Sequence, residues 1–279
     1  MATRHIRNLV PAVAIASLAF SPGARADDPL RASGTGSALG AMRRLAAAFA
    51  RASPGDRLEV VPSLGTSGAV QAVAHGALDL GFLGRDLEPQ EKALGLVALP
   101  YARTPFVFVA GPRSGVSGIT ADDAVRIYRG ELAAWPGGER VRLILRPKVD
   151  SDNLLLRAIS PEMAAAVEAA FAREGMLMAA TNQECDEMAA RTPGALAPSS
   201  LTQILAEREK LEPLAWNDVA PTLANLASGA YPLEKRLQIV FRAPPRPAVR
   251  RFLAFLGSAQ ARKILEDTGN LPLPLPPHE

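Results

Sequence analysis

The sequence contains very few of the side chains that bind metals or form disulfides. It has one cysteine, Cys185, and three histidines among 279 residues. A single cysteine forms no intramolecular disulfide, and Cys185 has only acidic neighbours in sequence, which do not lower the pKa of a thiol. We interpret it as a small buried hydrophobic residue. The scarcity of histidine argues against a structural zinc site and a Ser–His hydrolase, so we expect no metal and no cofactor.

Long hydrophobic runs are also missing, apart from one short run near the beginning. Leu9–Phe20 is apolar and uncharged but too short to span a bilayer. It follows Arg4 and Arg7 and precedes the small-residue sequence Ala24-Arg25-Ala26. This order is typical of a secretory signal peptide, so we predict that residues 1–26 are removed on export and that the mature protein is periplasmic.

The mature chain has no excess of basic residues. The full sequence contains 31 Lys and Arg against 28 Asp and Glu, a net charge of +3. The predicted signal peptide carries Arg4, Arg7 and Arg25 and no acid, which leaves 28 residues of each sign. Nucleic-acid-binding proteins usually carry clustered positive charge, so we predict no nucleic-acid partner.

Two short stretches of glycine and hydroxyl residues are the most informative feature that is present. Ser33–Ser37 and Ser63–Gly68 each follow a predicted strand and open a predicted helix. The flanking elements are strands over 29–33 and 58–61 and helices over 37–51 and 68–74. The first turn of a helix has unpaired backbone N–H groups, and with hydroxyls beside them such a turn attracts an anion.

A third predicted strand, 77–83, completes a β-α-β-α-β order typical of an open α/β sheet. Ligands of such sheets bind at the carboxyl ends of the strands, where both turns fall. Arg85 follows the third strand and adds positive charge at the same edge. The residues expected to face an anion on this wall are Gly36, Ser37, Thr66, Ser67 and Arg85.

The same residues are also compatible with roles that involve no anion site. Both turns are compatible with ordinary helix caps. Arg85 is equally compatible with a surface ion pair to Asp86 or Glu88. Ser67 lies beside glycines, but Ala69 stands where a nucleophile elbow needs its second glycine, which argues against a hydrolase.

The first turn also resembles a dinucleotide-binding fingerprint with relaxed spacing. Gly34, Gly36 and Gly40 are followed by Glu59 near the end of the second strand, where a ribose-binding acid might stand in such a protein. A lone match of this kind is weak, and an exported protein is a poor host for a nicotinamide cofactor.

The middle of the chain is predicted to be inserted into the first domain. A β-prone segment over 99–109 ends at the glycine-rich break 111–115, and a return strand over 237–241 would pair with it. The predicted boundaries are 27–109 plus 237–279 for the first domain and 110–236 for the second.

A strand over 141–145 in the second domain ends at Arg146 and leads to hydroxyl and amide side chains at a possible helix start. This segment would form the opposing wall, unless it is a solvated loop with a surface arginine. Arginine pairs well with phosphate-like and carboxylate groups. The residues expected to face the anion from this wall are Arg146, Ser151, Asp152 and Asn153.

Six short motifs recur in a fixed order along nearly the whole mature chain. They are 63–70, 77–81, 127–130 with 135–136, 145–152, 192–195 and 229–233. In this order the chain resembles the phosphate-binding periplasmic proteins of ABC importers. The resemblance implies a type II solute-binding fold, in which two α/β domains, each a mostly parallel sheet flanked by helices, are joined by two crossing strands. It also implies hinge closure on the ligand and delivery to a membrane permease, with no chemistry performed.

Two positions depart from that family. Arg85 stands where the family's best-known phosphate binder has an acid that accepts a proton from the ligand. The Ser-Gly-Thr loop of the family reads Ser151-Asp152-Asn153 here, with one extra residue after Arg146. Asp152 either accepts a hydrogen bond from a protonated phosphate or caps the helix.

We therefore predict a monomeric, non-enzymatic, exported binding protein that captures phosphate or a similar tetrahedral oxyanion and delivers it to an inner-membrane ABC permease. The alternatives are a secreted enzyme acting on phosphorylated substrates, and a sensor or scaffold that keeps the binding fold without transport. The enzyme needs a base or metal cluster that two remaining histidines do not supply.

Overall fold

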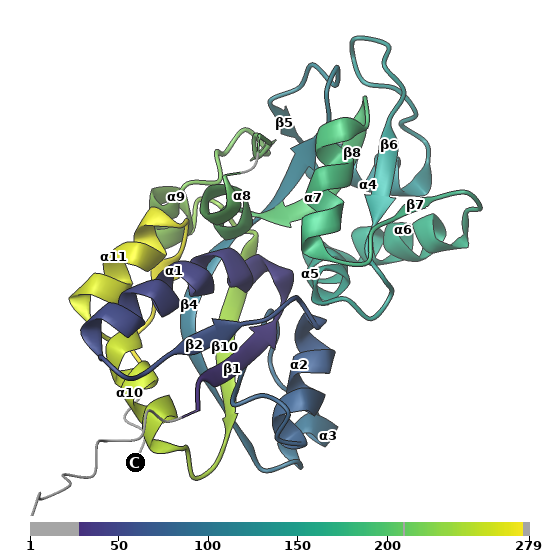
Figure 1. The fold of residues 1–279 in the computed structure, drawn as a ribbon. Coiled ribbons are helices and arrows are strands. Elements are labelled where there is room, and N and C mark those ends of the chain that lie inside the picture. The colour runs from purple at the N-terminus through teal and green to yellow at the C-terminus, as the bar shows by residue number, and fades with distance from the viewer. Residues whose placement is uncertain (1–27, 209, 276–279) are drawn as a thin grey trace, which may run out of the picture.

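The computed structural model describes residues 28–208 and 210–275, which form two lobes (Figure 1). The predicted signal peptide, residues 1–26, and His278 lie outside the described residues. Within the described ranges, no helix is both long and apolar enough to cross a membrane.

The first lobe contains the predicted β-α-β-α-β unit. Strand β1 (Leu30–Gly34) pairs in parallel with β2 (Leu58–Val60) and with β3 (Leu80–Leu83). Helix α1 (Gly36–Ala52) follows β1, and helix α2 (Gly65–Ala74) follows β2. The carboxyl ends of β1 and β2 therefore lead directly into the two helix starts that the sequence singled out.

Two long strands pass between the lobes. Strand β4 (Leu96–Ala110) runs antiparallel to β10 (Glu234–Arg242), which also pairs with β3. From Phe106 onward, β4 pairs instead with a strand of the second lobe. The chain thus enters the second lobe on β4 and returns on β10.

The second lobe is built from the chain between these two strands. Its strands are β5 (Gly118–Ile119), β6 (Arg142–Leu145), β7 (Leu177–Met178), β8 (Ala195–Ser200) and β9 (Ala215–Trp216). Its helices are α4 (Ala121–Arg129), α5 (Ser151–Ile159), α6 (Pro161–Ala172), α7 (Asn182–Arg191) and α9 (Leu223–Ser228). Helix α8 (Leu201–Glu207) follows β8 and packs on α1 at the junction of the lobes.

The remaining elements complete the first lobe. They are the short helix α3 (Pro89–Lys92), helices α10 (Pro247–Leu256) and α11 (Ala259–Asp267), and strand β11 (Leu271–Pro272), which pairs with β4. The main sheet follows the order β2-β1-β3-β10-β4-β8-β6-β7. Its parallel pairs lie within each lobe, and its antiparallel pairs involve the crossing strands.

Each lobe has its own hydrophobic core. One cluster joins α1, α10 and the first sheet, where Phe49 meets Phe252 edge to face with ring centroids 5.2 Å apart. The second cluster gathers β6, β8, α4 and α6, and Phe108 of β4 stacks on Trp216 with centroids 5.5 Å apart. Since burial of apolar surface drives folding, two separate cores give each lobe its own stability.

Helices α4 and α6 of the second lobe have side-chain caps at their starts. Thr120 caps α4, because its hydroxyl accepts a bond from the Asp123 N–H at 3.1 Å, and Gly130 ends that helix with a left-handed φ of 81°. Ser160 likewise caps α6.

Both crossing strands are longer than predicted. Strand β4 begins at Leu96 rather than at 99, and Pro100 and Pro105 lie inside it. Pro100 lies beside a register shift opposite Leu237 and Gln238, and Pro105 lies where pairing passes from β10 to β8. A proline lacks a backbone donor, so it is tolerated where the hydrogen-bond ladder is interrupted. Strand β10 also begins at Glu234, three residues before the predicted start at 237.

Candidate anion-binding cleft

The two glycine and hydroxyl turns lie side by side and are bonded to each other. The Ser33 hydroxyl donates to the Pro62 carbonyl at 2.6 Å, and the Ser63 hydroxyl donates to the Gly34 carbonyl at 2.8 Å. The Gly84 N–H, at the end of β3, donates to Thr66 Oγ1 at 3.0 Å. The carboxyl ends of three neighbouring strands are thereby held together at one edge of the first lobe.

Neither of these two helices is capped by the side chain of its N-cap residue. The N-cap residues are Thr35 for α1 and Leu64 for α2, and neither makes a side-chain cap bond. Helices α4, α5, α6, α7, α9 and α11, in contrast, each have such a bond. The Ser63 hydroxyl, one residue before the N-cap of α2, accepts from the Gly65 N–H at 3.3 Å, so α2 is capped in part by a residue outside the N-cap position.

A cavity of about 310 Å³ separates the start of α2 from the second lobe. One wall is Ser63–Gly68, which includes the first turn of α2. The other wall is formed by Arg146, Pro147, Val149–Ser151 and Ala180–Thr181. Backbone N–H groups and hydroxyls on one side thus face a guanidinium and a hydroxyl on the other, which is a suitable arrangement for a small oxyanion.

Arg146 is held rigidly at the end of β6. Its side chain is only 2 % exposed. It donates to the Ala179 carbonyl at 2.5 Å and to Asp150 Oδ2 at 2.6 Å, while its buried Nε finds no partner among the described residues. A buried, unsatisfied donor is costly, so Arg146 retains a donor that a ligand could satisfy.

Asp150 is the carboxylate that faces Arg146. Its Oδ1 accepts from the Asp152 N–H at 2.9 Å, so it also caps α5. Burial raises the pKa of Asp150, and the nearby negative charge of Asp152 raises it further, although Arg146 acts in the opposite direction. The carboxyl group is therefore protonated more readily than an exposed aspartate.

Arg85 does not stand free at the cleft. It makes a two-pronged pair with Glu91 at 2.6 and 2.8 Å, approaches Glu88 at 3.3 Å, and donates to Ser67 Oγ at 3.0 Å. The hydrogen bond from Arg85 lowers the pKa of Glu91, and the same bond raises the pKa of Arg85. This is the ion-pair interpretation of Arg85, with Glu91 rather than Asp86 as the main partner.

The start of α1 meets the second lobe directly. Ser37 accepts a bond at 2.9 Å from the ammonium of Lys235, the second residue of β10. Lys235 also donates to Asp152 Oδ1 of α5, whose other oxygen accepts from Asn182 Nδ2 of α7 at 3.0 Å. The side chains of Lys235 and Asp152 are 1 % and 0 % exposed. A buried ion pair thus joins the two lobes.

Further contacts hold the lobes together at this point. Gln183 Nε2 donates to the Gly36 carbonyl at 3.0 Å and to Glu207 at 2.9 Å. A Cβ on Gly36 would lie 2.8 Å from Asn182 Cβ, so the close approach of α7 favours glycine here. The cleft is therefore closed over α1 and hollow over α2.

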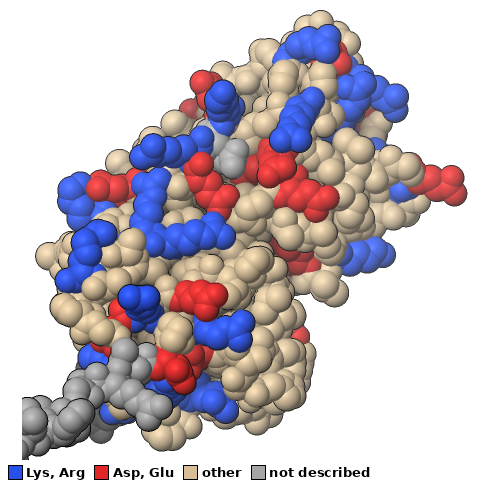
Figure 2. All heavy atoms as spheres, in the orientation of Figure 1, with Lys and Arg blue, Asp and Glu red and all other residues tan. Residues whose placement is uncertain are grey.

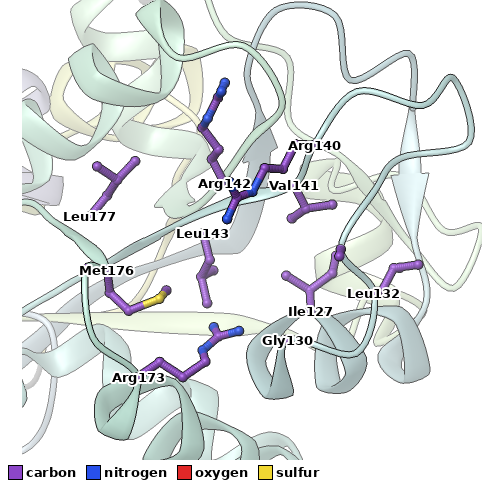
Figure 3. A pocket seen from close by; sticks show the side chains of 12 residues that line it. Ile127, Gly130, Leu132, Arg140, Val141, Arg142, Leu143, Arg173, Met176 and Leu177 are labelled. Atoms are coloured by element: carbon purple, nitrogen blue, oxygen red, sulfur yellow. The ribbon is translucent and has the colours of Figure 1, made fainter.

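A second cavity, of about 330 Å³, lies within the second lobe and is lined by Arg140, Arg142 and Arg173 (Figure 3). Arg173 extends its guanidinium toward Leu143, and burial lowers the pKa of Arg173. None of the predicted site residues lines this cavity. It provides basic side chains without the helix starts that converge on the cleft.

The remaining candidates for other chemistry have structural roles. Cys185 is buried, and burial raises the pKa of its thiol, as expected of a hydrophobic core residue. Within the part of the chain that the structure describes, no group of three or more His, Cys, Asp or Glu residues is arranged to hold a metal ion. Charges of both signs alternate on the face shown in Figure 2, without a continuous basic patch.

The comparison with protein families identifies the fold. The model of the PBP superfamily domain matches residues 20–260. The chain belongs to the PBP superfamily. Two relatives of this PBP chain are phosphate-binding proteins PstS: that of Bacillus subtilis is 26% identical, covering 75% of this chain and 69% of its own, and that of Borreliella burgdorferi is 25% identical, covering 74% and 77%.

The fold of this PBP protein is also similar to solved structures. A phosphate ABC transporter substrate-binding protein from Clostridium perfringens, solved with bound phosphate, superposes with a TM-score of 0.76 at 16% identity, covering 88% of this chain and all of its own. The predicted two-lobe type II fold is confirmed, as is the resemblance to phosphate-binding proteins of ABC transporters.

The structure distributes the predicted site residues of this PBP chain over two places. Thr66, Ser67, Arg146 and Ser151 line the cavity, whereas Ser37 and Asp152 belong to the closed contact at α1. Asn153 is directed into its own loop, where its amide donates to the Pro147 carbonyl at 2.6 Å.

The sequence analysis missed Lys235. It lies in the charged run Glu234-Lys235-Arg236, which is easily interpreted as a solvent-exposed turn. Strand β10 begins at Glu234 and alternates, so that Lys235 points inward while Arg236 is exposed. Recognising the earlier start of this strand would have placed the lysine inside.

Proposed function

We propose that this chain is an exported solute-binding protein that captures phosphate or a similar tetrahedral oxyanion between its lobes and delivers it to an ABC-type permease. The observation that carries the proposal is Arg146, which is 2 % exposed, lines the cavity and keeps a buried Nε without a partner among the described residues. The first turn of α2 lines the opposite wall of the same cavity.

The contacts proposed for the anion come from both lobes. Thr66, Ser67 and the first-turn N–H groups of α2 would hold one side, and Arg146 and Ser151 the other. A guanidinium and several N–H groups in an enclosed site form charge-assisted bonds, which are stronger than neutral ones. Relatives at 25% and 26% identity are phosphate-binding proteins, which supports phosphate as the first anion to test.

The wider organisation belongs to the same proposal. Removal of residues 1–26 would release a monomeric periplasmic protein that binds without catalysis. The two hydrophobic cores support two domains close to residues 27–109 plus 237–279 and 110–236, with Phe106–Val109 of β4 packed in the core of the second lobe. Hinge bending at β4 and β10 would open the cleft for the ligand.

Calorimetric titration tests the proposal. The mature protein is unfolded to remove any bound ligand, refolded, and titrated with phosphate, sulfate, molybdate and tungstate. We expect saturable binding of at least one of these anions, together with a rise in unfolding temperature because ligand stabilises the folded state. If none of the four anions produces binding heat or a thermal shift, the oxyanion-binding function is refuted.

A further inference from the structure

The cations of the closed cleft are neutralised by carboxylates of the chain itself. Arg146 pairs with Asp150, and Lys235 pairs with Asp152. Each pair is well buried, and a buried charge needs a compensating partner at all times. An anion that enters the closed cleft therefore meets cations that already have partners.

We propose that Lys235 is an anion-binding residue of the cleft and that Asp152 is its internal counterion, which an entering oxyanion displaces. This inference rests on the proposed function. The Asp152 carboxylate stands in for the ligand, because it is an anion that accepts a hydrogen bond from the same ammonium. The ligand and the carboxylate thus compete for one lysine.

The surroundings of the ammonium are those of an anion site once Asp152 is withdrawn. Lys235 Nζ is already bonded to Ser37 Oγ at 2.9 Å, in the first turn of α1. That helix lacks a side-chain cap, so its free N–H groups are oriented toward the same region. An ammonium, a hydroxyl and a helix start together favour a negative group.

Lys235 also lies close to the cavity described above. A Cβ placed on Gly84 would be 2.7 Å from Lys235 Cε and 2.9 Å from Ser151 Oγ. Ser151 lines the cavity, so only the space beside Gly84 separates the lysine stem from the cavity wall. An anion held by Arg146 and α2 could therefore reach the ammonium after a small movement of the 150–152 loop.

Asp152 can leave the lysine without becoming an isolated buried charge. Its Oδ2 accepts from Asn182 Nδ2 at 3.0 Å, and it lies in the first turn of α5, where the helix dipole stabilises a negative group. These partners belong to the second lobe and move with Asp152. The carboxylate therefore keeps partial compensation while the ligand takes its place at Lys235.

The experiment compares Asp152→Asn with Lys235→Met by phosphate titration of the refolded, ligand-stripped protein. Asp152→Asn keeps the shape of the side chain and removes the competing charge, so we expect at least about tenfold tighter phosphate binding. Lys235→Met removes the ammonium and should weaken binding by at least about tenfold. Glu187→Gln on α7, at an exposed pair with Arg191, removes the same charge far from the lysine and should leave affinity unchanged.

The double variant Lys235→Met, Asp152→Asn keeps the test decisive if the unpaired Asp152 of Lys235→Met prevents folding. It removes the buried pair as a whole, which well-packed proteins often tolerate. It is compared with Asp152→Asn, which keeps the ammonium, and should bind phosphate at least about tenfold more weakly than that variant. Equal affinities of these two variants would overturn the anion-binding role of Lys235.

The outcomes separate this inference from the proposed function. If the wild type binds phosphate and Asp152→Asn binds it equally or more weakly, the counterion role is wrong and the proposed function stands. If the wild type binds no oxyanion but Asp152→Asn binds phosphate, the counterion role is supported and the function of the wild type as an oxyanion carrier is wrong. If neither protein binds, both proposals fail.

Discussion

The starts of α1 and α2 have similar sequences and neighbouring positions, but the second lobe treats them differently. Over α1 it places Asn182 and Gln183 close against Gly36, and Lys235 links Ser37 of α1 to Asp152. Over α2 it leaves a cavity of about 310 Å³ with Arg146 on the far wall. A helix start supplies backbone N–H donors, while the opposing surface decides whether a ligand or the protein itself accepts their hydrogen bonds.

Removing the Arg146 side chain from the far wall of the cavity should cause the largest loss of oxyanion affinity. Arg146→Ala removes the guanidinium that faces α2, and loss of a charge-assisted pair in an enclosed site should weaken oxyanion binding by at least about tenfold. Arg140→Ala, in the second cavity, changes net charge equally and should leave affinity within about twofold. Titration calorimetry measures both. Equal losses in the two variants would mean that the cleft over α2 is not the site.

Adding one methyl group should distinguish the closed helix start from the hollow one. Gly36→Ala brings a Cβ to 2.6 Å from Gln183 Oε1, whereas a Cβ on Gly68 meets only Leu64 Cβ at 3.1 Å. Overpacking costs about 1–3 kcal/mol, so Gly36→Ala should favour an open form of ligand-free protein. Small-angle scattering should show a larger radius of gyration for Gly36→Ala and no change for Gly68→Ala. A compact Gly36→Ala protein would mean that the closed contact over α1 does not hold the lobes.

The stability contributed by the arginine–carboxylate pair of each wall should change with pH in opposite directions. This is the smallest of the expected effects. Arg85 lowers the pKa of Glu91 below its ordinary 4.5, so the stability that Glu91 contributes is present above that pH and lost on acidification. The pKa of Asp150 is raised above 3.8 by burial, so its contribution is complete below that value and is lost as pH rises.

Denaturant unfolding of Glu91→Gln and Asp150→Asn between about pH 7 and about pH 4 measures these contributions. The advantage of the wild type over Glu91→Gln should shrink on acidification, by on the order of 1 kcal/mol. The amount by which the free energy of unfolding of the wild type exceeds that of Asp150→Asn should increase on acidification. If the stability difference from the wild type changed with pH in the same direction for Glu91→Gln and Asp150→Asn, the opposite pH responses of the two walls would be contradicted.

Local sequence patterns were sufficient to predict the order of strands and helices in the first lobe and the segments on the two sides of the cleft. Glycine and hydroxyl residues after apolar strands located both helix starts, and the strand before Arg146 located the opposing wall. The partners of the two cations were not predictable, because no local signal selects Glu91, six residues along, over Asp86 or Glu88 as the partner of Arg85, and Asp152 precedes Lys235 by 83 residues. In both cases the folded structure determined which acid neutralises the cation.

The position of β10 in the sheet has a consequence for the order of folding. This strand lies between β3 and β4, at the centre of the first lobe, although it begins only at Glu234. The second lobe, in contrast, is built from one continuous stretch of chain that leaves the ribosome earlier. The first lobe cannot complete its sheet until the chain has been synthesised as far as β10, so its central strand pairs only after the whole second lobe is present.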